Sequence, residues 1–228
     1  MTMTAVNSWP QLVVFDNDGV LVDTERLAVR VDQQVLALMG WELPLEEVIA
    51  RFVGSGHAAM RLALSERLGR ELPHDWDEPY SDMYRAAFRD ALCPIDGAPE
   101  LLQELAAHEV PHCVASNSTV PQMEYSLGVT GVLPLVAGRL FSGQDFGRPK
   151  PDPDVYLRAA AAMGVDPADA VAVDDSPAGV ESAVAAGMRV IGFSGGLHPP
   201  ERLLAAGAHH LAPTHAAVGA LLRRGLAG

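Results

Sequence analysis

Acidic residues gather just beyond an apolar run near the N-terminus. The stretch QLVVFDNDGVLVDTE (residues 11–25) places Asp16 and Asp18 two positions apart, directly after its apolar part. A second pair, Asp174 and Asp175, follows the apolar run AVAV. Carboxylates brought together in a partly desolvated cleft repel one another, and a hard divalent cation such as Mg²⁺ removes that conflict. These residues indicate either solvated turns or a metal site suited to phosphate chemistry.

The surrounding polar residues favour the second interpretation. Ser116 and Asn117 follow another apolar run, and Lys150 lies in the segment GRPKPDP. A lysine and a metal ion would neutralise phosphate charge, which leaves Asp16 free to attack phosphorus as a nucleophile. Asp18 could then act as general acid and later as general base. Ser116 and Asn117 could hold the transferring phosphoryl group by hydrogen bonds.

Short apolar runs predict the strands that would bring these groups together. The runs are QLVVF (11–15), HCVAS (112–116), AVAV (170–173) and RVIGF (189–193). Helical stretches separate the last three runs, and this alternation indicates a parallel sheet covered on both faces. Ligands bind beyond the carboxyl ends of the strands in such sheets, which is where the first three runs end in polar groups.

A long helical block interrupts this alternation. The interval from about Thr24 to Cys93 contains helical patterns and no strand-like run. About 70 residues is too long for an ordinary crossover between strands. We therefore predict two domains, a core formed by residues 1–23 and 96–228 and a helical domain formed by residues 24–95.

Four segments in this order resemble the motifs of the haloacid dehalogenase (HAD) superfamily. They are FDNDGVLVDTE, VASNS, RPKPD and VDDSPAG. The resemblance implies an α/β fold, a Rossmann-like parallel-sheet core with an inserted all-helical cap. It also implies that Asp16 is the nucleophile and a metal ligand, and that Asp18 is the acid/base and binds the metal through its backbone carbonyl.

The same resemblance assigns the remaining site residues. Ser116 and Lys150 would bind the phosphoryl group, with Asn117 beside them, and Asp174 and Asp175 would complete a Mg²⁺ site. The position of the cap is similar to that in the subfamily of β-phosphoglucomutases and small sugar-phosphate phosphatases. The segments LFSGQDFGRPKPDP and VDDSPAG are also similar to those of 6-phosphogluconate phosphatases.

The chemistry within that superfamily varies, and particular residues discriminate between its branches. Asp18 and the second acidic pair argue against the metal-independent dehalogenases. The mutases carry a histidine and a lysine in the cap where this chain has Ala28 and Val53. We therefore expect a phosphatase acting on a small phosphorylated metabolite, with a mutase as the alternative. A non-catalytic binding module of the same fold is a second alternative, because fold does not imply function.

Specificity is expected to lie in the helical domain. The loop VGSGHAAMR (53–61) carries glycines together with His57 and Arg61. His57 is a candidate substrate contact. Arg61 is either a contact to an anionic substrate or a solvated helix residue.

The amino-acid composition argues against certain classes of binding partner. The chain has 228 residues and a formal net charge of −13, which repels nucleic acid and anionic membrane surfaces. Its two cysteines suggest no disulfide framework, and no signal peptide is visible. We expect a cytoplasmic protein that is a monomer or a weak dimer and binds neither nucleic acid nor membranes.

Overall fold

The chain divides into two compact units. The computed structural model describes residues 9–53 and 56–225, without the side chains of residues 56–58. One unit, here called the core unit, comprises Met1–Val22 and Pro94–Gly228, and the other, the helical unit, comprises Asp23–Cys93. These boundaries lie within two residues of the predicted domain boundaries. That each unit is a functional domain stays a prediction.

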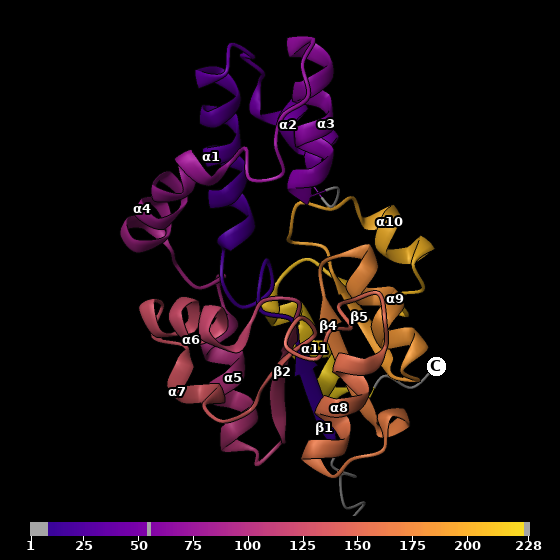
Figure 1. The fold of residues 1–228 in the computed structure, drawn as a ribbon. Coiled ribbons are helices and arrows are strands. Elements are labelled where there is room, and N and C mark those ends of the chain that lie inside the picture. The colour runs from indigo at the N-terminus through magenta and orange to yellow at the C-terminus, as the bar shows by residue number, and fades with distance from the viewer. Residues whose placement is uncertain (1–8, 54–55, 226–228) are drawn as a thin grey trace, which may run out of the picture. The chain divides into compact units, whose positions relative to one another are not determined.

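A parallel sheet forms the centre of the core unit (Figure 1). Within the described residues it has six strands in the order β3-β2-β1-β4-β5-β6. The strands are β1 (Leu12–Phe15), β2 (His112–Ser116), β3 (Leu140–Ser142), β4 (Ala170–Asp174), β5 (Arg189–Phe193) and β6 (His210–Ala212). The predicted α/β class with a parallel sheet is confirmed.

The two edge strands were absent from the sequence-based prediction. β3 and β6 have three residues each, and two of the three in each strand are only partly buried. An apolar run that short does not stand out from the surrounding sequence. Pairing with β2 and β5 in the folded protein defines them as strands.

Alternate residues of each central strand face opposite layers of helices. In β1, Val13 and Phe15 pack into one apolar cluster, whereas Leu12 and Val14 pack into the other. Burial on both faces explains why this strand is a continuous apolar run with no polar alternation. Both faces of the sheet are therefore covered by apolar layers, which pack against its strands.

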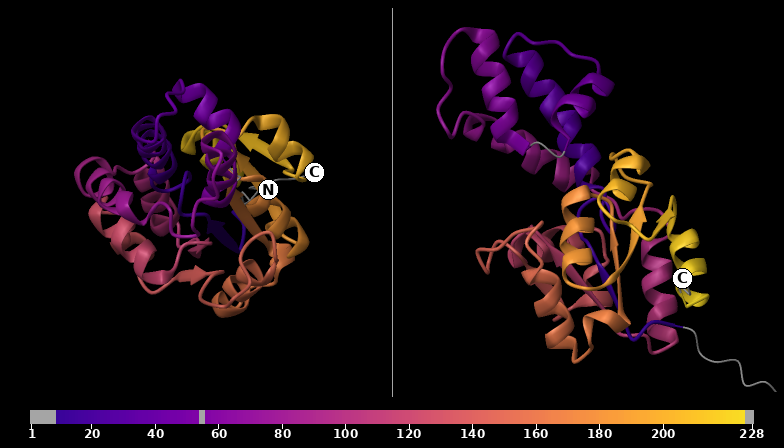
Figure 2. Two further views of the ribbon diagram at one scale, coloured as in Figure 1. Left: turned by 45° about the horizontal axis from the view of Figure 1, so that its top comes forward. Right: turned by 90° about the vertical axis from the view of Figure 1, so that its right-hand side faces the viewer.

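Helices cover both faces of the sheet (Figure 2). One layer contains α5 (Ala98–Ala107), α6 (Val120–Val129), α7 (Leu133–Val136) and α11 (His215–Arg223). The other layer contains α8 (Asp154–Met163), α9 (Pro177–Ala185) and α10 (Pro200–Ala205), with a short 3₁₀ helix η2 (Pro167–Asp169) before β4. Ser176 caps α9, because its side chain accepts a hydrogen bond from the Gly179 N–H.

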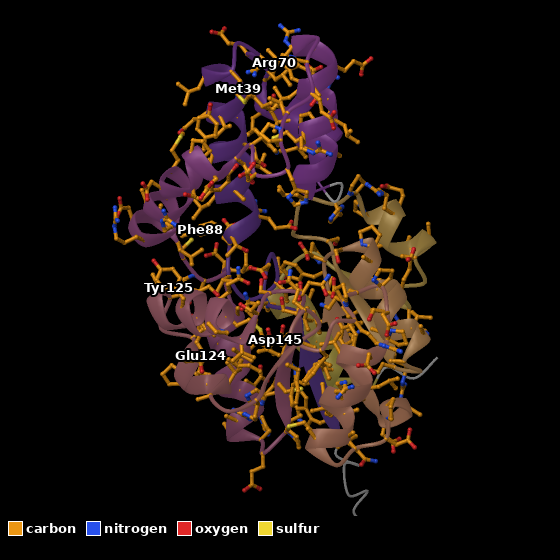
Figure 3. All side chains as sticks on the ribbon, viewed as in Figure 1. Met39, Arg70, Phe88, Glu124, Tyr125 and Asp145 are labelled. Carbon is orange, nitrogen blue, oxygen red and sulfur yellow. The ribbon has the colours of Figure 1, made fainter. Side chains whose placement is uncertain are left out.

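The helical unit contains no strand within its described residues. Its elements are α1 (Thr24–Leu38), α2 (Leu45–Phe52), α3 (Gly56–Leu68), η1 (Glu78–Tyr80) and α4 (Ser81–Ala91). The Tyr84 hydroxyl of α4 joins this helix to α1, because it donates to Asp32 Oδ1 at 2.6 Å. Figure 3 labels Met39, at the end of α1, and Arg70, just after α3. Across the described part of the chain, every helix is too short or too polar to cross a membrane.

Candidate active site

The carboxyl ends of β1 and β4 bring the two acidic pairs together. The two strands are paired in register from Leu12 opposite Ala170 to Phe15 opposite Val173. The Asp16 N–H extends this ladder by donating to the Val173 carbonyl at 2.9 Å. In the sheet, β2 and β3 lie on one side of β1, and β4, β5 and β6 lie on the other. The β1–β4 junction is therefore the switch point at which open α/β sheets bind ligands.

Three buried carboxylates meet at this junction. Asp16, Asp174 and Asp175 each offer an oxygen, and these oxygens lie within 4.8 Å of one another. One lysine ammonium, that of Lys150, accompanies these three acidic groups. Such an excess of negative charge in a buried site fits a hard divalent cation with oxygen ligands, so the donor set is suited to Mg²⁺.

Lys150 bridges two of the three carboxylates. Its Nζ lies 2.8 Å from Asp16 Oδ1 and 2.7 Å from Asp174 Oδ2, and its side chain is only 4% exposed. Burial by itself lowers the pKa of Lys150, but the charges of Asp16 and Asp174 outweigh burial and raise that pKa well above its ordinary value. The ammonium is therefore charged at neutral pH and fixes the separation of the two carboxylates.

Asp16 and Asp174 differ in how well their charges are compensated. Burial raises the pKa of the Asp16 carboxyl to about 8, against the opposing effect of Lys150. Burial acts on Asp174 in the same direction, yet Lys150, Ser176 and Tyr156 donate to it and hold its pKa below the usual range. Asp174 is thus the stable anion of the pair. Asp16 needs a further positive charge to be fully ionised at neutral pH.

Three glycines leave room for the acidic side chains. A Cβ at Gly179, in the first turn of α9, would overlap the Asp174 carboxylate. A Cβ at Gly19 or at Gly196 would overlap the carboxylate of Asp175 from the loops after β1 and β5. Gly19 also has a φ of +76°, which side chains with a Cβ rarely adopt. These positions need glycine because the backbone approaches the carboxylates closely.

Two serines hold the carboxylate of Asp18. The Ser118 hydroxyl donates to Asp18 Oδ2 at 2.7 Å, and the Ser116 hydroxyl donates to the same oxygen at 3.2 Å. The Ser118 N–H in turn donates to Ser116 Oγ at 3.0 Å. The loop after β2 therefore orients Asp18, which lies in the segment that follows β1.

Asn117 binds the backbone of Lys150. Its Oδ1 accepts from the Lys150 N–H at 2.7 Å, and its Nδ2 donates to the Lys150 carbonyl at 3.3 Å. A Cβ at Gly143 would lie 3.0 Å from Asn117 Oδ1, so this glycine allows the loops to meet. Nearby, Asp145, labelled in Figure 3, accepts from the Val120 N–H at the start of α6. The hydrogen bonds of Asn117 thus join the loop after β2 to the segment after β3 that carries Lys150.

Comparison with known proteins identifies the family. The model of the haloacid dehalogenase-like hydrolases matches residues 10–187. The chain belongs to the haloacid dehalogenase-like hydrolase family. The resemblance inferred from the four sequence motifs is confirmed, and the protein is an enzyme of the hydrolase class.

Individual relatives extend over most of this HAD-like hydrolase. The chain is 36% identical over 192 residues to the 6-phosphogluconate phosphatase of Escherichia coli K12, covering 82% of this chain and 84% of the relative. It is 30% identical over 187 residues to the validoxylamine A 7'-phosphate phosphatase of Streptomyces hygroscopicus subsp. limoneus, covering 81% and 85% of the two chains.

A solved structure is similar along nearly the whole length of this HAD-like hydrolase. It is a HAD family hydrolase from Deinococcus radiodurans R1, crystallised with bound phosphate and sodium. The TM-score is 0.84 at 31% sequence identity, and the comparison covers 96% of this chain and 98% of the other.

The structure of this HAD-like hydrolase brings together all but one of the predicted site residues. The exception is His57, whose side chain lies outside the described residues. Arg61, in the same predicted loop, donates from Nη1 to the Leu72 carbonyl at 2.9 Å, which ties α3 to the segment that follows it.

Sequence reasoning missed two residues of the candidate site. Ser118 lies two positions after Ser116, and this spacing within VASNS could have indicated it. Tyr156 donates to Asp174 from α8 and had no sequence signal, because it occupies an ordinary apolar position of the helix.

Proposed function

We propose that this enzyme is a Mg²⁺-dependent phosphatase that hydrolyses a small phosphorylated metabolite of the sugar-phosphate or phosphogluconate type. The observation that carries the proposal is the cluster of Asp16, Asp174 and Asp175 with the Lys150 ammonium at the ends of β1 and β4. The two curated relatives named above are phosphatases, which supports the same reaction class.

Asp16 is the proposed nucleophile. Its carboxylate oxygen would form a bond to phosphorus while the bond between phosphorus and the substrate's ester oxygen breaks, giving an aspartyl phosphate and an alcohol. The burial of Asp16 favours this role, because a poorly solvated carboxylate is a stronger nucleophile once ionised. Lys150 holds Asp16 Oδ1 in place and supplies positive charge toward the phosphoryl oxygens.

Asp18 is the proposed general acid and base. Protonated, it would give its proton to the departing ester oxygen, and the resulting carboxylate would then take a proton from the water that attacks the aspartyl phosphate. The hydroxyls of Ser116 and Ser118 keep its carboxylate in one orientation in the structure. Hydrolysis releases inorganic phosphate and returns both aspartates to their starting states.

The other predicted residues support these two. Asp16, Asp174 and Asp175 would hold Mg²⁺, together with the backbone carbonyl of Asp18. The ion, when bound, would neutralise part of the negative charge on the phosphoryl oxygens. Asn117 positions Lys150 through its backbone, and Ser116 lies where its hydroxyl can reach a phosphoryl group beside Asp18.

Two residues in the helical unit favour hydrolysis over phosphoryl transfer between sugar positions. Ala28 and Val53 stand where β-phosphoglucomutases carry a histidine and a lysine that restrain water and hold the sugar. Without those groups, attack by water on the aspartyl phosphate is the default outcome. The substrate contacts of His57 stay a prediction.

Phosphate release from a panel of sugar and sugar-acid phosphates tests the proposal. Each substrate is assayed with Mg²⁺ and again with EDTA, for the wild type and for Asp16→Asn. We expect release that requires Mg²⁺ and falls by at least roughly a thousandfold in Asp16→Asn, because removal of a catalytic nucleophile costs that much.

Other outcomes would change the assignment. Transfer of phosphate between positions of a sugar, stimulated by a sugar bisphosphate, would identify a mutase. No reaction with any substrate, together with no effect of Mg²⁺ on the thermal midpoint, would favour the non-catalytic binding module.

A further inference from the structure

A buried tyrosine shares an oxygen of Asp174 with Lys150. Tyr156 lies on α8, and its hydroxyl donates to Asp174 Oδ2 at 2.7 Å. Lys150 Nζ reaches the same oxygen at 2.7 Å. The centroid of the Tyr156 ring lies 5.0 Å from Nζ, within the range of a cation–π contact. Tyr156 therefore contacts both members of the ion pair.

The other oxygen of Asp174 is also held. Asp174 Oδ1 accepts from the Ser176 N–H at 2.9 Å and from the Ser176 hydroxyl at 2.8 Å. A carboxylate offers about four lone-pair positions, and the described part of the chain supplies Asp174 with four donors. Such a carboxylate has little freedom to rotate. It gives Lys150 a fixed anchor in addition to its contact with Asp16.

The Tyr156 ring stabilises the Lys150 ammonium without occupying any of its N–H protons. An ammonium has three N–H donors, and in the structure Lys150 directs them at Asp16 and Asp174, which leaves donor capacity for a phosphoryl oxygen. A further acceptor beside Nζ would compete with the substrate. An aromatic face attracts the cation and adds no strong acceptor.

The ring and the hydroxyl of Tyr156 serve separable purposes. The ring packs in the apolar layer with Val155, Ala159 and Ala160 of α8, which a phenylalanine could also do. Burial raises the pKa of the Tyr156 hydroxyl well above its ordinary value, and Asp174 raises it further, so the hydroxyl stays a donor. The bond to Asp174 is thus the specific contribution of tyrosine.

We propose that Tyr156 is a positioning residue of the active site, whose hydroxyl locks Asp174 so that Lys150 keeps its place beside Asp16. The inference rests on the proposed function, in which Asp16 is the nucleophile. The competing interpretation is a core tyrosine whose hydroxyl only needs a buried partner. The two interpretations differ in whether Lys150 becomes looser when the hydroxyl is removed.

The sequence provides a direct reporter for this question. Lys150 is the only lysine of the 228 residues, so protein labelled with ¹³C,¹⁵N-lysine gives a single lysine side-chain signal in an NMR spectrum. The exchange of its ammonium protons with water measures how firmly Nζ is held. This measurement needs no substrate.

The test compares Tyr156→Phe with two other tyrosine-to-phenylalanine variants. Tyr84→Phe removes a partly buried tyrosine–aspartate bond in the helical unit, and Tyr125→Phe changes a tyrosine of α6 that is 48% exposed and labelled in Figure 3. The first control matches the loss of stability. The second matches the chemical change at the surface.

We expect Tyr156→Phe to speed ammonium exchange by about tenfold, because it removes one charge-assisted hydrogen bond from the Asp174 anchor. On the best substrate of the panel, kcat should fall roughly tenfold while KM changes less than about twofold, since Lys150 acts on the transferring group. The two control variants should keep wild-type exchange and wild-type kcat.

Wild-type ammonium exchange in Tyr156→Phe would overturn the inference, whatever the activity. Faster exchange with an unchanged kcat in an active enzyme would also overturn it, because positioning would then not serve the reaction. If the wild type hydrolyses no phosphate ester at all, the proposed function fails, and the exchange measurement alone decides whether Tyr156 positions Lys150.

Discussion

Each unit of this protein contains a tyrosine hydroxyl that donates to an aspartate, in very different surroundings. In the helical unit, Tyr84 of α4 donates to Asp32 of α1, so the bond joins two helices. In the core unit, Tyr156 donates to Asp174, which also binds Lys150 at the end of β4. The same pair of residue types thus stabilises a helix contact in one unit and belongs to a charged cluster in the other.

A hydrogen bond between a tyrosine and an aspartate thus takes its role from its position in the fold. Helices bury stripes of side chains along their length, so a Tyr–Asp bond between them has mainly structural consequences. The ends of parallel strands converge at one edge of a sheet, so polar groups placed there meet one another. Similar substitutions in the two units should therefore have unequal effects on stability and activity.

The largest expected effect is the loss of the buried ammonium. Lys150→Met would leave Asp16 and Asp174 buried without their shared cation, and we expect a loss of about 3–5 kcal/mol in the free energy of unfolding. Urea unfolding of the Mg²⁺-free protein measures it. The comparison is Arg85→Met, which removes an exposed ion pair with Asp82 in the helical unit and should cost less than about 1 kcal/mol. Equal losses would contradict the contrast between the units.

Acid should weaken the core unit through His215. Burial lowers the pKa of this histidine to about 4, and the Phe193 ring packs against it. The unfolded chain, with a pKa near 6.5, then binds a proton that the folded chain does not, so stability falls as the pH drops from about 6.5 to 4. The difference amounts to about 3 kcal/mol.

Unfolding curves at pH 7.5 and pH 4.5 measure that effect. His215→Gln keeps an amide donor for the Asp96 carbonyl, which His215 Nδ1 contacts at 3.2 Å, and should remove the acid-induced loss of stability that His215 contributes. His108→Gln, at an exposed position of the same unit, should leave it intact. An unchanged pH dependence in His215→Gln would assign the acid sensitivity to other groups.

A methyl group at Gly179 should disturb the active site specifically. Its Cβ would overlap the Asp174 carboxylate, so Gly179→Ala should cost about 1–3 kcal/mol in stability and lower phosphatase activity. In the helix α6, a Cβ at Gly128 would come no closer than 3.9 Å to Leu133, so Gly128→Ala should be tolerated or slightly stabilising. Thermal unfolding and phosphate release are measured for both variants. A harmless Gly179→Ala would show that Asp174 can move without consequence.

The smallest expected effect lies in the helical unit. Tyr84→Phe removes the bond to Asp32 and should reduce stability by about 1–2 kcal/mol, as for a partly buried hydrogen bond to a carboxylate. Urea unfolding gives the loss, and phosphate release should stay at the wild-type rate. A large fall in kcat would mean that this pair, too, serves the reaction.

The amino-acid sequence was enough to predict the central strands and the residues at their ends. Continuous apolar runs are detectable because strands buried on both faces exclude polar residues. Asp16, Asp18, Ser116 and Asp174 could be predicted because polar residues stand at or just beyond the ends of those runs. The HAD family and the hydrolase class followed from four such segments in order, and the family comparison confirms both.

The tertiary structure alone decided how these residues contact one another. No sequence pattern indicated that the Asn117 amide would bind the Lys150 backbone, or that Ser118 and Ser116 would hold Asp18. Tyr156 occupies an ordinary apolar position of α8, and only the packing of that helix against β2 and β1 brings its hydroxyl to Asp174. Such contacts join residues far apart in the chain, and their distances depend on how the helices and strands pack.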